Sequence, residues 1–158
     1  MKYVFKKGRH FAWHFFKFYF KNSGTIEHIV KFSKNCLYSF GTIDDFDVNK
    51  LFGRSFGYHH TNSIRFGWRS DGKNIIIYAY NYKDGVRNIK ELCKCIVNKE
   101  YTFKMKYSPK DVLLEISSKD WTTKFAMDIN AKRKFGYKLY PYFGGNRTAP
   151  HEMSIELF

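Results

Sequence analysis

Residues 62–82 read NSIRFGWRSDGKNIIIYAYNY, a pattern of two strands with a tight turn between them. In the first half, Ile64, Phe66 and Trp68 alternate with polar or small residues, which is the period of two that a half-buried strand shows. The Ser-Asp-Gly-Lys sequence that follows is typical of a hairpin turn. Residues 74–82 alternate again, with aromatic side chains on one face. The stretch therefore predicts a β-hairpin.

The same alternation recurs on both sides of this hairpin, in short segments separated by Gly, Asn, Asp and Ser. A second Asp-Gly turn, within residues 83–86, leads into a third strand that ends near Val97. Only residues 47–52 predict a helical turn, with Asp47 as its N-cap and Gly53 at its end. Many short antiparallel strands with one helical turn predict an all-β sandwich or barrel. Further strands are expected at residues 2–6, 12–20, 25–32, 36–40, 100–107, 111–117, 121–127, 135–143 and 152–157, the first and last of them as neighbours.

The chain has 158 residues and no repeat, linker or low-complexity tract, so one domain over residues 1–158 is expected. Its 28 Lys and Arg against 14 Asp and Glu give a net charge of +14, which makes a polyanionic partner worth considering. Most lysines stand singly between apolar residues, as on the solvated face of a strand. The densest basic stretch is residues 1–10, which could form an arm that touches an acidic surface.

Cys36, Cys93 and Cys95 cannot all pair within one chain, and a bridge between the last two would be strained on one strand. Reduced thiols and a cytoplasmic location are therefore expected. No CxxC occurs, and the cysteines have no further ligand at a recognisable zinc-site spacing, so no metal site and no cofactor is predicted. The apolar run at residues 11–20 contains a histidine and a lysine and no cleavage site follows it, so we expect neither an export signal nor a membrane partner.

Two stretches, residues 53–69 and 136–151, combine His, Arg, Asn, Trp and Tyr near glycine-rich turns. Arginine binds planar anions or vicinal hydroxyls, and aromatic faces stack on sugar rings or bases. A structural role is the alternative, with the arginines paired to the aspartates of residues 44–47 and the histidines bonded to loop carbonyls. Together with the tyrosines of residues 74–82, the candidate ligand-binding residues are His59, His60, Asn62, Arg65, Trp68, Arg69, Tyr78, Tyr80, Tyr142, Asn146 and His151.

Catalytic residues are hard to assemble from this sequence. A sugar hydrolase needs two carboxylates about 5–10 Å apart, whereas the aspartates of residues 44–47 share one turn. No catalytic cysteine motif or phosphate-binding loop occurs. A lyase that uses Tyr142, His60 and Arg65 is conceivable, but no spacing requires it. The sequence thus predicts no catalytic site and a protein that is not an enzyme.

Three blocks resemble a family of small, single-domain bacterial and phage proteins without established activity: CLYSFGTIDDFDVNKLFG at 36–53, FGYHHTNSIRFGWR at 56–69 and LYPYFGGNRTAPHEMSIEL at 139–157. The resemblance runs from about residue 25 to the end and is weakest before it. It implies a concanavalin-like or jelly-roll sandwich, and it implies no catalytic residue.

Three functions from different classes fit these observations. The first is a non-catalytic, lectin-like module for carbohydrate, with Tyr78, Tyr80 and Tyr82 as an aromatic platform. The second is a structural or decoration protein of a phage virion or other large assembly, with acidic protein surfaces, virion neighbours or copies of itself as partners. The third is nucleic-acid binding, which the lack of a clustered basic stripe weakens.

Overall fold

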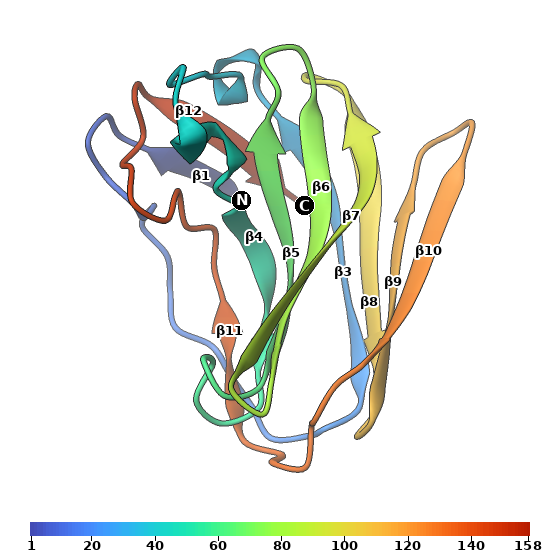
Figure 1. Ribbon diagram of the computed structural model, residues 1–158. Coiled ribbons are helices and arrows are strands. Elements are labelled where there is room, and N and C mark those ends of the chain that lie inside the picture. Colours follow the sequence, from blue (N-terminus) through green and yellow to red (C-terminus); the bar gives the residue numbers. More distant parts are fainter.

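Two six-stranded antiparallel sheets face each other in the computed structural model, which describes residues 1–158 (Figure 1). The strands are β1 Lys2–Phe5, β2 Phe18–Tyr19, β3 Gly24–Phe32, β4 Asn49–Ser55, β5 Ser63–Ser70, β6 Ile75–Lys83, β7 Val86–Cys95, β8 Glu100–Tyr107, β9 Asp111–Ser117, β10 Thr122–Asp128, β11 Gly136–Leu139 and β12 Met153–Leu157. The first sheet has the order β1-β12-β3-β8-β9-β10 and the second β2-β11-β4-β5-β6-β7. The predicted all-β sandwich is confirmed.

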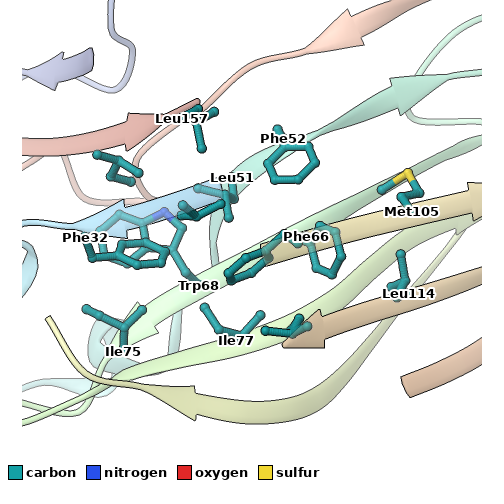
Figure 2. Close-up of a cluster of buried hydrophobic side chains, with 14 of the residues drawn as sticks. Phe32, Leu51, Phe52, Phe66, Trp68, Ile75, Ile77, Met105, Leu114 and Leu157 are labelled. Atoms are coloured by element: carbon teal, nitrogen blue, oxygen red, sulfur yellow. The ribbon is translucent and has the colours of Figure 1, made fainter. Parts of the chain in front are cut away.

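The core lies between the sheets and contains 32 buried residues. On β5, Phe66 and Trp68 are fully buried, and the Trp68 ring lies 5.4 Å from that of Phe32 on the opposite sheet. Figure 2 shows these three side chains with their neighbours. The predicted alternation of β5 is therefore correct, and it places Arg65 on the face that points away from the core.

The helical turn predicted over residues 47–52 is wrong, because β4 begins at Asn49. Leu51 and Phe52 are both fully buried, and the pairing with β5 shifts between Lys50 and Gly53. Such a bulge breaks the period of two, so the segment does not alternate in the sequence. A 3₁₀ turn occurs slightly earlier, at Ile43–Phe46.

Three strand predictions are also wrong in extent. Residues 36–40 form no strand, residues 12–20 form only β2, and residues 135–143 form only β11 before Pro141. Residues 10–17, which we call the strap, instead run extended over the surface toward the edge beside β11 (Figure 1). Its aromatic residues look like those of a buried strand, but Trp13 is 70% exposed and Phe16 84%.

The first and last strands are neighbours as predicted, with Lys2 opposite Glu156 and Phe5 opposite Met153. The two helical segments are turns of three and four residues, and no helix has the length and hydropathy needed to cross a bilayer.

Candidate functional site

A cavity of about 610 Å³ lies against the second sheet, on the side away from the core. Four Lys or Arg, three His and five Tyr line it, without any Asp or Glu. These are Lys50, Arg65, Arg87 and Lys138, then His14, His59 and His60, and finally Tyr80, Tyr82, Tyr137, Tyr140 and Tyr142. The cavity is therefore cationic and aromatic.

Strand register brings these side chains together. Arg65 on β5 is opposite Tyr80 on β6, and Tyr82 on β6 is opposite Arg87 on β7. An isolated antiparallel bridge places Tyr142 beside Lys50 of β4. Side chains of cross-strand partners lie on the same face of a sheet, so residues from five segments share one surface.

Arg65 is the most enclosed cation of the cavity, with an exposure of 7%. Burial lowers the pKa of its guanidinium to about 10, so it keeps its charge at neutral pH. Its carbon Cζ lies 5.8 Å from the Tyr80 ring, and its Nε has no hydrogen-bond partner. A buried, charged donor without a protein acceptor favours an anionic ligand, because leaving it unpaired is costly.

Lys50 also lies beside the Tyr80 ring. Its Nζ lies 5.5 Å from that ring and 5.8 Å from the Tyr142 ring, and it donates to the carbonyl oxygen of Gly144 at 2.9 Å. Burial, followed by the nearby charge of Arg65, lowers the pKa of Lys50 to about 8. This amine therefore changes its protonation state close to physiological pH.

The turn that supplies the Gly144 carbonyl requires glycine. Gly144 has φ +83°, and a Cβ at this position would lie 2.0 Å from the carbonyl oxygen of Arg147. The left-handed backbone and the close approach both exclude a larger residue.

His59 and His60 form one end of the cavity, with ring centroids 4.2 Å apart. The Nδ1 of His59 lies 2.7 Å from the hydroxyl of Tyr137. Burial lowers the pKa of His59 to about 4, and the charge of Arg65 adds to this, so the imidazole is neutral at pH 7. A neutral imidazole can accept or donate a proton in a hydrogen bond.

The strap forms a further wall. The His14 ring stacks on Tyr140 with centroids 3.9 Å apart, and the hydroxyl of Tyr140 donates to the carbonyl of Phe15. Phe11 forms an isolated bridge with Tyr142, and Phe11 and Phe16 both line the cavity. These aromatic residues do not enter the core; they enclose the cavity.

Five of the sequence-predicted site residues line this cavity: His59, His60, Arg65, Tyr80 and Tyr142. Their assignment to a ligand remains a prediction, and the structure brings them to one surface.

Three other candidates lie elsewhere on the same strands. Trp68 is fully buried between the sheets, because it occupies one of the alternate positions of β5 that point into the core. Arg69 donates from Nε to the hydroxyl of Tyr78 at 2.7 Å, and both lie outside the cavity lining. With exposures of 8% and 4%, Tyr78 and Tyr80 do not form the expected flat, open platform.

The remaining candidates have local structural contacts. The side-chain oxygen of Asn62 accepts from the backbone N–H of Asp84 at 2.9 Å, which ties two turns together. The backbone N–H of Asn146 donates to Asp47, and Nε2 of His151 lies 2.7 Å from the carbonyl oxygen of Asn35. None of the three lines the cavity.

Several lining residues were missed in the sequence, including Lys50, Arg87 and Tyr137. Arg87 could have been found, since an Asp-Gly hairpin pairs Lys83 with Val86 and hence Tyr82 with Arg87. Lys50 was hidden by the bulge of β4. No group of three metal-ligating side chains occurs, and the three cysteines are free and lie outside the cavity lining.

The fold is similar to that of several carbohydrate-active enzymes. An alginate lyase from Klebsiella pneumoniae superimposes with a TM-score of 0.67 at 8% identity, over 86% of this chain and 59% of the lyase. The alginate lyase AlyC3 gives 0.66 at 14% identity, over 98% of this chain and 71% of the lyase. The chain thus spans less than two thirds of the first enzyme's length. A family 7 alginate lyase in complex with product gives 0.51 at 8% identity, over 89% and 61%.

No protein-family model and no curated protein matches the sequence, so the resemblance to bacterial and phage proteins stays a prediction. The prediction of a protein that is not an enzyme is wrong, because the similar structures with TM-scores of 0.66 and 0.67 are polysaccharide lyases. That prediction rested on the lack of a facing carboxylate pair and of catalytic motifs, and it set aside a lyase that uses Tyr142, His60 and Arg65 because no spacing in the sequence requires one. The structural comparisons support a jelly-roll sandwich fold similar to that of these alginate lyases.

Proposed function

We propose that this protein is a lyase that cleaves an acidic polysaccharide by β-elimination in the cavity on the second sheet. One observation carries the proposal: Arg65 is buried and unpaired in a cavity lined by four Lys or Arg and five Tyr, without a carboxylate. Such a lining attracts anions, and its tyrosines offer faces for sugar rings.

The lining distinguishes elimination from hydrolysis. Glycoside hydrolysis with two carboxylates needs one as general acid and the other as base or nucleophile. The cavity offers no Asp or Glu for these roles. Elimination needs a cation that neutralises the sugar carboxylate, a base that removes the adjacent proton and an acid that protonates the leaving oxygen.

The reaction then balances without a further reactant. The base takes the proton from C5 of a uronate, the electron pair of that C–H bond forms the C4=C5 double bond, and the C4–O bond breaks. The leaving oxygen receives a proton from the acid, and the base later returns its own proton to solvent.

Arg65 and Lys50 both lie within 6 Å of the centroid of the Tyr80 ring, close enough to act on a single sugar unit. In this proposal Arg65 binds the uronate carboxylate, which makes the neighbouring C5 proton more acidic. Lys50, with its pKa lowered to about 8, removes that proton in its neutral form. The phenols of Tyr80 and Tyr142, both within 6 Å of Lys50 Nζ as measured to the ring centroids, are the candidate proton donors.

The test measures the ultraviolet absorbance of the C4=C5 product with alginate, polygalacturonate and hyaluronan as substrates. We expect one of them to be cleaved, and Arg65→Met to lower the rate by about 10²–10³-fold, as loss of a charge-stabilising donor does. Tyr80→Phe and Tyr142→Phe decide which phenol donates the proton. Arg133→Met is the matched control, because Arg133 is exposed and lies outside the cavity lining.

Mass spectrometry of the products distinguishes elimination from hydrolysis. Products heavier by one water would indicate hydrolysis and refute elimination. Tight binding of all three polymers without any product would refute the enzymatic proposal.

A further inference from the structure

A second groove, of about 460 Å³, lies where β1 leads into the strap. Lys2, Lys6 and Arg9 line it together with Phe11 and Trp13. On β1 the inward residues Tyr3 and Phe5 are buried, so the alternate positions, Lys2 among them, point outward. We call this the outer groove.

The cations of the outer groove form no ion pair within the chain. The four ion pairs of the structure involve none of Lys2, Lys6 and Arg9, and no Asp or Glu lines the groove. Lys2 and Lys6 are four positions apart on extended chain, a separation of roughly 13 Å. This spacing of the backbone positions favours an extended anion over a single small ion.

The outer groove meets the cavity at Phe11, which lines both. Phe11 bridges to Tyr142, and Tyr142 bridges to Lys50 inside the cavity. The His10 ring stacks on Tyr142 with centroids 5.2 Å apart and an interplanar angle of 7°, which fixes the start of the strap at this junction. The two hollows thus meet at Phe11 on the edge of the sandwich, with the groove on the outer face of the first sheet and the cavity on the outer face of the second.

We propose that the outer groove is a remote binding subsite for the acidic polysaccharide, which continues from the cavity across Phe11. The inference rests on the proposed function of the cavity. Lys2, Lys6 and Arg9 pair with carboxylates of successive sugar units, and the exposed face of Trp13 stacks on a sugar ring. The connection through Phe11 favours a polysaccharide over a nucleic acid, because the polysaccharide proposed for the cavity would enter the groove by passing this residue at the edge of the sandwich.

The subsite predicts a dependence on polymer length. The triple variant Lys2→Gln/Lys6→Gln/Arg9→Gln is compared with wild type by calorimetry, using alginate or polygalacturonate and the trisaccharides derived from them. We expect about tenfold weaker binding of the polymer, because three exposed charge contacts are lost, and unchanged binding of the trisaccharide. All three side chains are exposed, so the variant should fold as wild type does.

A second triple variant, Lys99→Gln/Lys110→Gln/Lys119→Gln, removes the same charge from exposed turns between β7, β8, β9 and β10. An equal loss of polymer binding in this control would show that the loss in the first variant comes from the lower net charge of the protein, and it would overturn the subsite. So would unchanged polymer binding in the first variant, or an equal loss for the trisaccharide. A larger loss for single-stranded DNA than for polysaccharide would assign the groove to nucleic acid instead.

The failure of the two proposals can be told apart. Wild-type protein that neither binds nor cleaves any acidic polysaccharide refutes the function of the cavity. Wild-type cleavage that the first triple variant retains in full, for polymer and trisaccharide alike, refutes only the outer groove.

Discussion

Replacing Lys50 by Met is expected to stabilise the protein while abolishing its activity. Lys50 is a partly buried cation, and its nearest partners are the carbonyl of Gly144 and two aromatic rings. No ion pair compensates its charge. Methionine fills a similar volume without the cost of dehydrating an ammonium group.

The size of the effect follows from the lowered pKa. A fall from 10.5 to about 8 corresponds to a cost of ~3 kcal/mol for keeping this group charged in the folded protein at pH 7. The hydrogen bond to Gly144 is lost in the variant, which offsets ~1 kcal/mol of the gain. We therefore expect Lys50→Met to raise the free energy of unfolding by about 1–3 kcal/mol at pH 7.

The sign of the pH dependence is fixed by the direction of the shift. Below pH 8 the amine is charged in both folded and unfolded protein, and the full cost applies. Between pH 8 and 10.5 the amine is largely neutral in the folded protein but still charged in the unfolded protein, so the unfolded state binds more protons. The free energy of unfolding of the wild type therefore rises with pH over this range, relative to that of the variant. The advantage of the variant should thus shrink over this range.

Urea unfolding of both proteins at several pH values between 6 and 10.5 measures this difference. Lys106→Met is the matched control, because Lys106 is exposed on β8 and outside the cavity lining. A Lys50→Met protein that is less stable than wild type at pH 7, or a stability difference that does not change with pH, would refute the reasoning. Elimination activity should meanwhile be lost in Lys50→Met, and in wild type it should rise as pH passes through about 8.

Three further substitutions test the framework of the site by denaturant unfolding. Trp68→Ala should cost about 3–5 kcal/mol, because it empties a fully buried position between the sheets, and a loss below 1 kcal/mol would show that Trp68 is not in the core. Arg54→Ala should cost about 3 kcal/mol or more, since its buried guanidinium donates to four protein oxygens; a neutral result would contradict that network. Gly144→Ala should cost about 1–3 kcal/mol through its positive φ and should lower activity by displacing the carbonyl that holds Lys50, whereas unchanged stability would contradict the turn geometry.

The sequence predicted the fold well where strands alternate regularly. The parity of β5 and β6 follows from Ile64, Phe66 and Trp68 on one face and the tyrosines on the other, and the Asp-Gly turns set the pairing. It failed where a bulge shifts the register, as at Lys50, and where aromatic side chains remain on the surface, as in the strap. Neither outcome is encoded in local periodicity.

The candidate site was predicted in part for the same reason. Sequence reasoning selects Arg65, Tyr80 and Tyr142, because their residue types suit a binding site and their strand positions can be read from the alternation. Lys50 depends on a bridge to Tyr142, which lies far along the chain. A contact of this kind arises from tertiary structure, and no spacing in the sequence reveals it.

The positions of the three tryptophans give the protein a built-in optical reporter. Trp13 is exposed in the outer groove, Trp68 is sealed in the core, and Trp121 lies just before β10 in the other sheet. The cavity lining contains tyrosines and no tryptophan. A shift in indole emission on titration therefore signals contact at the groove, while a ligand confined to the cavity leaves the emission spectrum unaltered.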